Sequence, residues 1–388
     1  MAKNTRLVKT FFKILVCPLD WGIGHATRCV PVIRQLQKEN HELILAADGK
    51  AFDFFKANFP GNKIIRFKGV SVKYPAGNKM MLKMMLQAPG IFFSIFQEHR
   101  KLKKIIEENG IDVVISDNRF GLWSGNVHSI YITHQLMIKA PAGWKWTEPI
   151  LHRIHRWFIK HYDECWIPDL PGEPNLSGDL SHKYPLPHHA KFIGPQSRFE
   201  NSIRQLPDQI PDSNRPITQS PDLLALLSGP EPQRSIFENI ILKELDKHRG
   251  LYAVILQGKP GTFNQSSPAP GVFVFNHLPD EALANLITTS QTIICRSGYS
   301  TLMDLVTLGK SAVLVPTPGQ TEQEYLAKYL SAKGWFSTMK QDEFELGKAM
   351  AGNNISDNIS DNINSNDGLL TSIISNFGDL IKNKNKCS

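Results

Sequence analysis

The chain has 388 residues, a formal net charge of +8 and 41% hydrophobic residues. Because this length exceeds what one typical core needs, we expect two domains. No uninterrupted apolar run approaches the ~18 to 20 residues of a membrane-spanning helix, and the N-terminal segment leads into a strand rather than a signal-peptide cleavage site. We therefore expect a cytoplasmic protein. The cysteines lack the spacing of zinc sites or disulfide frameworks, so we expect them to be reduced.

The positive charge is concentrated between residues 61 and 104, where ten Lys or Arg accompany a single acid, Glu98. They flank the run "MMLKMMLQAPGIFFSIF". No nucleic-acid-binding motif accompanies them, so we expect no nucleic-acid partner. A basic rim around an apolar helix at 79–104 is typical of contact with an anionic membrane surface, which would make the protein peripheral on the inner face of the membrane. The alternative is a buried helix with solvated lysines at its ends.

Strand-like and helical runs alternate through residues 1–195. The strand-like runs are "FFKILVC", "HELILAA", "NKIIRF", "IDVVIS", "SIYITH" and "DECWIP", and the helical stretches lie near 25–39, 48–58, 79–109 and 147–160. This alternation predicts a parallel, doubly wound α/β sheet. On the last of these helices, His152 and His155 lie one turn apart without an acid at matching spacing, so we expect a solvated basic face and no metal site.

The composition changes after Gly194. Residues 196–221 are rich in Pro, Ser, Asn and Gln and predict an interdomain linker. The alternation restarts over 222–350, so the predicted fold class is α/β, with two Rossmann-like doubly wound domains that face a central cleft. Residues 351–388 combine an Asn/Ser/Asp-rich repeat, expected to be a flexible loop, with an apolar-periodic last helix that can cross back to the first domain.

The stretch "LDWGIGHATRCVPVIRQL" follows the first strand and opens a helix. Its glycines, Gly22 and Gly24, allow close approach of the chain to a ligand. His25 follows these glycines, and because an unperturbed histidine side chain has a pKa near 6.5, this residue type suits a general base. The alternatives are a nucleotide-phosphate loop, or a histidine at the helix N-terminus that only shapes the turn.

Four more polar residues lie at or directly after the ends of strand-like runs in this half. Asp117 and Asn118 follow "IDVVIS", His134 follows "SIYIT", and Asp20 follows the first strand. Ligands of open parallel sheets bind outside the carboxyl ends of the strands, so we expect these side chains on the acceptor side of the cleft. The spacing leaves open whether Asp117 contacts His25 or caps the next helix.

The second half contains stronger ligand-binding signals. Ser297 and Gly298 open a helix after the strand "QTIIC", and the backbone NH groups of such a turn bind phosphate oxygens. Asp304, about two turns into that helix, can accept hydrogen bonds from a ribose diol. The remaining candidates are Arg296 before the turn, the Ser228 and Gly229 loop after another strand, and the polar helix start at Glu322, Gln323 and Glu324.

The block from Ile294 to Leu330 resembles the C-terminal domain of family 28 glycosyltransferases, which have the GT-B fold. The resemblance implies a UDP-sugar donor, with its diphosphate at Ser297 and Gly298, its ribose at Asp304 and its sugar at Gln323 and Glu324. The family's peptidoglycan enzyme has the longer Glu in place of this Asp and two glutamines in place of this Gln-Glu pair. The identity of the donor sugar, UDP-N-acetylglucosamine or another, therefore stays open.

The turn "DWGIGHATR" resembles the Gly-x-Gly-His turn of the same superfamily. The resemblance implies inverting transfer of a hexosyl or N-acetylhexosaminyl group to a hydroxyl acceptor, lipid-linked or otherwise, with His25 as base and Asp117 orienting it. No Asp-x-Asp motif ends a suitable strand, so we expect neither a metal nor a cofactor beyond the donor.

Two rival functions share the predicted fold. "GIGHATRC" also resembles the Gly-x-Gly-His-x-x-Arg-Cys turn of the UDP-sugar hydrolase of the pseudaminic acid pathway, where water is the acceptor. The other rival is a non-catalytic protein that binds nucleotide sugars. The apolar, basic segment favours transfer over hydrolysis, and the intact Asp304 favours an active donor site.

Overall fold

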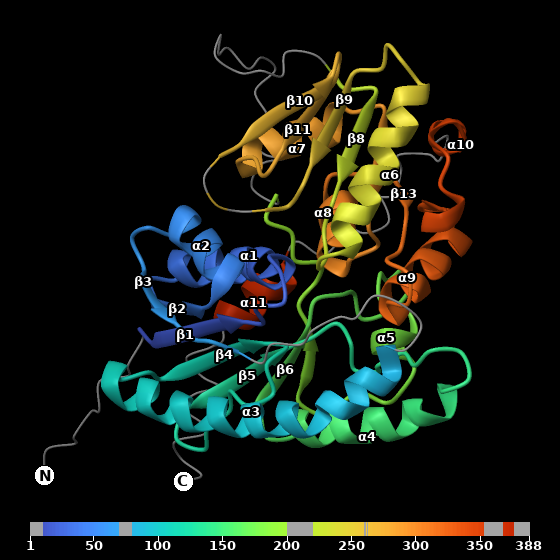
Figure 1. Cartoon of the computed structure of the whole chain (residues 1–388). Helices are drawn as coiled ribbons and strands as arrows, with labels where there is room; N and C mark the ends of the chain where they lie inside the picture. Colours follow the sequence, from blue (N-terminus) through green and yellow to red (C-terminus); the bar gives the residue numbers. More distant parts are fainter. Residues whose placement is uncertain are drawn as a thin grey trace, which may run out of the picture.

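The computed structural model describes residues 11–69, 80–199, 220–259, 261, 263–352 and 368–375, without the side chains of residues 80–88 and 91. Two seven-stranded sheets form two lobes that are stacked along the long axis of the molecule (Figure 1). Most of the expected linker, 196–221, and of the tail, 351–388, lies outside the described residues. The domain boundaries drawn from composition therefore stay predictions.

The first sheet has the strand order β3-β2-β1-β4-β5-β6-β7 and is entirely parallel. Its strands are β1 (Lys13–Pro18), β2 (Glu42–Ala47), β3 (Lys63–Arg66), β4 (Val113–Asp117), β5 (His128–Ile132), β6 (Glu164–Ile167) and β7 (Ala190–Phe192). The order reverses between β1 and β4, where Pro18 pairs with Asp117. Open α/β sheets bind ligands at such a reversal point.

Both faces of this sheet are covered by helices, so successive strand residues are buried on opposite sides. Ile14 and Val16 pack with helices α1 (Gly24–Lys38) and α2 (Gly49–Asn58). Leu15 and Cys17 pack on the other face with Leu102 of helix α3 (Met80–Asn109). This part of the chain also contains η1 (Lys145–Thr147), α4 (Glu148–Ile159) and α5 (Asp179–His182).

The second sheet has the order β10-β11-β9-β8-β12-β13-β14. Its strands are β8 (Leu223–Leu226), β9 (Ala253–Leu256), β10 (Gln265–Ala269), β11 (Val272–Phe275), β12 (Thr292–Cys295), β13 (Val313–Leu314) and β14 (Ser337–Thr338). Its helices are α6 (Gln233–Lys247), α7 (Asp280–Thr289), α8 (Tyr299–Thr307), α9 (Thr321–Ala332), η3 (Gln341–Glu343) and α10 (Leu346–Ala351). All pairings are parallel except that of the edge strand β10 with β11, which is antiparallel. The sequence did not predict strand β10. The predicted fold class is confirmed.

Helix α4 differs from the sequence expectation, because its histidines point inward. Nδ1 of His152 donates a 3.0 Å hydrogen bond to the Leu136 carbonyl, and His155 is 3% exposed. Burial lowers the pKa of His155 to about 4, so this ring is neutral. The expectation of a solvated face for these two residues is therefore wrong. The helix instead exposes apolar side chains, Ile150, Ile154 and Trp157.

The last described helix, α11 (Leu369–Ser375), belongs to the first lobe although it follows the second lobe in the chain (Figure 1). Leu370 and Ile374 are buried in the core that α1 and α2 form with the first sheet. The terminal apolar segment thus crosses back to the first lobe, as its sequence pattern allowed. The four described cysteines, Cys17, Cys29, Cys165 and Cys295, are buried and free.

We expect Ile374→Ala to lower the free energy of unfolding of the first lobe by about 2 to 4 kcal/mol, because it leaves a cavity beneath α11. Urea denaturation followed by tryptophan fluorescence measures this. Thr371→Ala, at an exposed position of the same helix, is the matched control. Equal stability of the two variants would contradict the docking of α11.

Candidate active site

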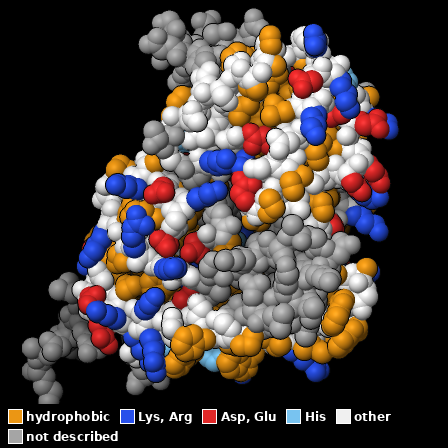
Figure 2. Space-filling view, viewed as in Figure 1, with side chains coloured by type: hydrophobic (Ala, Val, Ile, Leu, Met, Phe, Trp, Pro, Cys, Tyr) orange, Lys and Arg blue, Asp and Glu red, His pale blue; other side chains and the backbone are white. Residues whose placement is uncertain are grey.

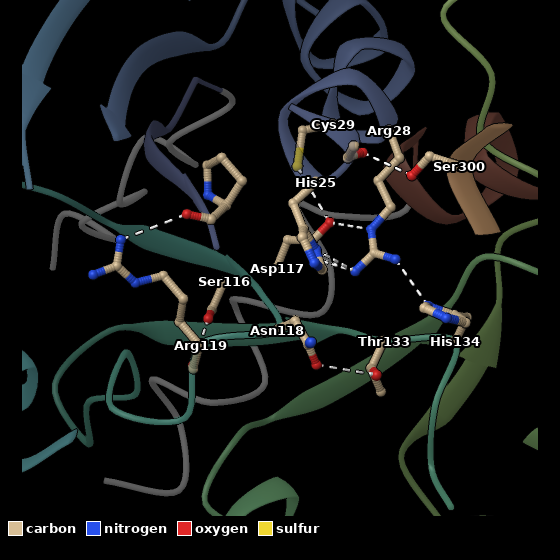
Figure 3. Close-up of polar contacts among 12 residues, drawn as sticks. His25, Arg28, Cys29, Ser116, Asp117, Asn118, Arg119, Thr133, His134 and Ser300 are labelled. Atoms are coloured by element: carbon tan, nitrogen blue, oxygen red, sulfur yellow. Dashed lines mark hydrogen bonds and ion pairs between the residues drawn. The ribbon is translucent and has the colours of Figure 1, made fainter. Parts of the chain in front are cut away.

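The central feature of the lobe interface is a pair formed by His25 and Asp117 (Figure 3). His25 lies in the first turn of α1, directly after the β1 loop, and Asp117 is the last residue of β4. Nδ1 of His25 is 2.8 Å from Oδ1 of Asp117 and 2.9 Å from Nη2 of Arg28. Among the described residues, Nε2 of His25 has no hydrogen-bond partner, so this nitrogen is available to a substrate proton.

Asp117 is also held by Arg28, one turn after His25 on α1. The guanidinium binds both carboxylate oxygens, with Nε 2.5 Å from Oδ2 and Nη2 on Oδ1. The Cys29 thiol lies 3.6 Å from Oδ2. Burial opposes ionisation of Asp117, yet the charges of Arg28 and His25 hold the pKa of this carboxyl well below its usual range. Asp117 is therefore an ionised, fully hydrogen-bonded carboxylate.

Arg28 was missed as a site residue, although the spacing of "GHATR" contains the signal. Residues three apart lie on one face of a helix, so His25 and Arg28 must face the same way. Nη1 of Arg28 extends the contacts to His134 after β5, at 2.8 Å from its Nδ1. The guanidinium thus joins two strand ends of the first sheet.

His134 connects this group of residues to the second lobe. Its Nε2 is 2.8 Å from Oε1 of Glu322, in the first turn of α9. Its ring stacks on Tyr299 of α8, with centroids 3.9 Å apart and an interplanar angle of 9°. The sequence marks Glu322 only as a polar residue, and the family resemblance assigns the sugar-binding role to Gln323 and Glu324. The contact shows that Glu322 is the acid of α9 that faces the first lobe.

The N-terminus of α1 touches the N-terminus of α8. The Ser300 hydroxyl donates a 2.8 Å hydrogen bond to the carbonyl of Gly24. A Cβ on Gly24 would lie 3.2 Å from that hydroxyl oxygen, so the close approach favours glycine. Gly22 has no atom within 4 Å of an added Cβ and borders open space.

Two predicted acceptor-side residues support loops instead of joining this pair. Asp20 accepts a hydrogen bond from the Gly69 NH at 3.2 Å. Asn118 has a left-handed φ of 56° and accepts a 3.0 Å hydrogen bond from the Tyr131 hydroxyl. Both lie at the carboxyl edge of the sheet, as expected, but neither contacts His25.

In the second lobe, Ser297 and Gly298 form the turn before α8. The Ser297 hydroxyl donates to the carbonyl of Gln323 at 2.8 Å, which ties α8 to α9. Gly298 caps the helix, and no atom lies within 4 Å of a Cβ built on it. Space beside the first NH groups of α8 is what a bound phosphate requires.

The other polar residues near this turn hold its surroundings in place. The buried guanidinium of Arg296 donates to the carbonyls of Val315 and Gln233 at 3.0 Å each. Gln323 accepts from the Thr317 NH, and Glu324 accepts from the Gly319 NH, both at 2.8 Å. These contacts fix the loop between β13 and α9.

The Ser228 and Gly229 loop follows β8 next to the same turn. Gly229 has a φ of 98°, a conformation that favours glycine. The hydroxyl oxygen of Thr317 would lie 4.0 Å from a Cβ on Gly229, and this buried atom has no hydrogen-bond partner in the described part of the chain. The Thr317 hydroxyl therefore lies next to this loop and is available for a further contact.

Asp304 contacts the start of the predicted linker. Its Oδ1 accepts a 2.7 Å hydrogen bond from Ser197, and its Oδ2 lies 3.7 Å from Nε of Arg198. Burial raises the pKa of Asp304 to about 6, in spite of Arg198.

Within the described ranges, no group of three or more His, Cys, Asp or Glu side chains is placed to hold a metal ion. No helix in those ranges has the length and apolar character needed to cross a bilayer.

Models of two protein families match the chain. Residues 235–361 match the glycosyltransferase family 28 C-terminal domain, and residues 12–135 match glycosyl transferase family 1. The second match includes His25, Arg28, Asp117 and His134. The chain is therefore a glycosyltransferase of the GT-B class with a family 28 C-terminal domain.

Its relation to individual glycosyltransferases is distant. It is 22% identical over 342 residues to the UDP-N-acetylglucosamine--N-acetylmuramyl-(pentapeptide) pyrophosphoryl-undecaprenol N-acetylglucosamine transferase of Actinobacillus pleuropneumoniae, covering 86% of each chain. It is 23% identical to an uncharacterised glycosyltransferase of Methanosarcina acetivorans, covering 84% of this chain and 83% of the other.

Solved structures have the same fold. The calicheamicin glycosyltransferase CalG4 superposes with a TM-score of 0.61 and 13% identity, covering 96% of this chain and 98% of the other. MurG of Acinetobacter baumannii superposes with a TM-score of 0.54 and 14% identity, covering 96% and 99%.

We expect Asp304→Asn to alter how stability depends on pH. A pKa raised in the folded state means that the folded protein binds this proton more tightly than the unfolded chain, so stabilisation is complete below about pH 4 and is lost as the pH rises through about 6. Relative to the Asn variant, the wild type should lose on the order of 2 kcal/mol between pH 4 and 7. Urea unfolding at a series of pH values measures this, and parallel pH profiles would contradict a buried Asp304 carboxyl.

Proposed function

We propose that the protein transfers a sugar from a UDP-sugar to the hydroxyl group of an acceptor, with inversion at the anomeric carbon. The observation that carries the proposal is the contact of two helix N-termini. The first turn of α1, which holds His25 next to Asp117, touches the first turn of α8 through Ser300 and Gly24. The proposed base and the proposed phosphate-binding turn thus lie on either side of one interface.

In the proposed reaction, the donor diphosphate binds beside Ser297 and Gly298, at the N-terminus of α8. Nε2 of His25 takes the proton of the acceptor hydroxyl. The oxygen of that hydroxyl attacks the anomeric carbon, and the bond from this carbon to the diphosphate oxygen breaks. The helix N-terminus stabilises the negative charge of the leaving UDP, so the proposal requires no metal. Nη2 of Arg28 lies 2.9 Å from Nδ1 of His25, but it donates to Oδ1 of Asp117, and in the proposal Nδ1 of His25 donates to the same carboxylate oxygen. Nδ1 is then protonated and Nε2 is free.

We propose the remaining donor contacts on the basis of the family resemblance. Asp304 would bind the ribose, which requires its carboxylate to share or give up the contact with Ser197. Gln323 and Glu324 would contact the donor sugar from α9. Ser228, Gly229 and the unpartnered Thr317 hydroxyl offer further diphosphate contacts.

Hydrolysis of a UDP-sugar is the second candidate function. The resemblance to the hydrolase turn includes Arg28 and Cys29, and both side chains contact Asp117. Water in place of the acceptor hydroxyl would be activated by the same His25. Release of free sugar from the donor alone would favour this candidate.

An apolar surface of the first lobe supports an acceptor at a membrane. Phe92, Phe93 and Phe96 of α3 are 53%, 65% and 52% exposed. Trp144, Trp146, Ile150, Ile154 and Trp157 of α4 and the segment before it are also exposed. Figure 2 shows hydrophobic side chains along the lower edge of the molecule, over α3 and α4, with Lys and Arg beside them. The part of the predicted 79–104 contact before Pro89 lies outside the described side chains.

The charges beside this surface match an anionic membrane. A hollow of about 390 Å³ next to Trp157 is lined by Arg153, Arg156, Lys160, His188 and His189 and by no acid. Aromatic side chains with basic neighbours bind the interface of anionic bilayers. We therefore propose a peripheral position on the inner face of the cytoplasmic membrane, with a lipid-linked acceptor.

His25→Ala should reduce sugar release or transfer by at least about 100-fold, because the proton acceptor is lost, while UDP affinity stays within twofold. The donor is first found by a thermal-shift screen of UDP-sugars, beginning with UDP-N-acetylglucosamine, and products are identified by mass spectrometry. His41→Ala, at a partly buried histidine remote from Asp117, is the control. Full activity of His25→Ala would remove His25 from the mechanism.

Purified protein should bind anionic liposomes at low salt. Joint replacement of Phe92, Phe93 and Phe96 by serine should weaken the binding by at least about tenfold, since three exposed rings leave the bilayer interface. Ile236→Ser, at an exposed position of α6 in the other lobe, should leave binding unchanged. Absence of binding by the wild type at any salt concentration would contradict the membrane surface. Sedimentation with vesicles measures all three proteins.

A further inference from the structure

Five side chains form a continuous series of contacts from the second lobe to the proposed base. We call them the cross-lobe network; four of them are labelled in Figure 3. The successive distances are 2.8 Å from Glu322 to His134, 2.8 Å from His134 to Arg28, 2.5 Å from Arg28 to Asp117 and 2.8 Å from Asp117 to His25. Only Glu322 comes from the second lobe.

The hydrogen bonds determine the protonation state of His134. Arg28 can only donate, so the Nδ1 that it contacts carries no proton. Nε2 then carries the proton and donates it to Glu322. Burial lowers the pKa of His134, in agreement with a neutral ring. Burial disfavours ionisation of Glu322, but His134, His25 and Arg28 lower the pKa of its carboxyl.

A thiol and two phenols packed against the network are neutral. The Cys29 thiol faces Asp117, and burial raises its pKa well above the ordinary value. The Tyr299 phenol donates to the carbonyl of Pro168, and burial raises its pKa likewise. Tyr131, on the neighbouring strand β5, is also a buried phenol with a raised pKa. Asp169 lies near Tyr299, and its carboxylate accepts from the NH groups of residues 170, 176 and 177.

The network therefore holds two carboxylates and one guanidinium. Arg28 balances Asp117, and Glu322 leaves one excess negative charge. When His25 accepts a proton from the acceptor, the whole network becomes neutral. Charges interact strongly in a partly buried site, so the excess negative charge stabilises the imidazolium that forms during transfer. Without Glu322, the same proton would leave a net positive charge.

We propose that Glu322 is a positioning residue of the second lobe that completes the base of the first lobe, so that His25 reaches full basic strength only when the lobes are joined through His134. The inference rests on the proposed function and concerns the control of its base. It links deprotonation of the acceptor to the presence of the lobe that carries the donor. A separated first lobe would hold a weaker base and would not activate an acceptor, or water, in the absence of the donor lobe.

Glu322→Gln tests this inference, because the amide oxygen can still accept from Nε2 of His134 while the charge is removed. The control is Glu173→Gln, which removes a carboxylate from another contact between the lobes, the ion pair of Glu173 with Lys333. The first measurement follows the His25 signal of histidine-labelled protein by NMR from pH 5 to 8, without substrate. His25→Ala identifies the signal.

We expect the midpoint of the His25 titration in Glu322→Gln to lie lower than in the wild type by on the order of one pH unit. With a donor in hand, kcat/KM should fall about tenfold at pH 7, and the acidic limb of its pH profile should move to lower pH. UDP affinity should stay unchanged. Glu173→Gln should match the wild type in each measurement.

The inference is overturned if the His25 titration of Glu322→Gln coincides with that of Glu173→Gln. Because the titration needs no substrate, it judges the network even if no UDP-sugar is turned over. Failure to turn over any UDP-sugar, with the titration shifted as expected, would overturn the proposed function alone.

Discussion

The buried ion pair of Arg28 with Asp117 is the constraint on which the rest of the site depends. Asp117 ends a central strand of the first sheet and is 0% exposed, so its charge would be very costly without a partner. Arg28 supplies that partner from α1 with two hydrogen bonds. Removing one member of a buried pair leaves the other charge uncompensated, at a cost of about 3 to 5 kcal/mol. The pair therefore fixes how α1 lies against β4.

That placement determines what the two lobes can do together. With α1 held by Asp117, its first turn presents His25 and brings the Gly24 carbonyl against Ser300 of α8. The strand order reverses between β1 and β4 in the first sheet and between β8 and β12 in the second. The helices that follow the strands at these two points have their N-termini at the lobe interface. One such terminus carries the proposed base and the other the proposed phosphate turn. Chemistry between a donor and an acceptor can therefore be divided between the lobes.

Periodicity predicted the fold class, and the strand ends placed His25 and Asp117 at the same edge of the sheet, because both follow from local rules of parallel sheets. The spacing left the contact between the two residues open, and only the family resemblance implied it. Arg28 was overlooked because a buried arginine has the same sequence appearance as a solvated one. On α9 the polar residues were recognised, but sequence cannot tell which of three consecutive side chains faces the other lobe, and this is Glu322. The contact of Asp304 with Ser197 is a long-range pairing that no local pattern contains. On α4 the polarity pattern was misleading, since hydrogen bonds and ring packing bury its histidines.

The most direct test of this account is the steady-state rate of Arg28→Lys. Lysine keeps the positive charge but cannot bind both oxygens of Asp117 in the planar arrangement of a guanidinium, nor reach His134 at the same time. If the pair orients the base, sugar turnover should fall by at least about 100-fold while UDP affinity and the folded state are retained. Turnover of Arg28→Lys at the wild-type rate would contradict the account.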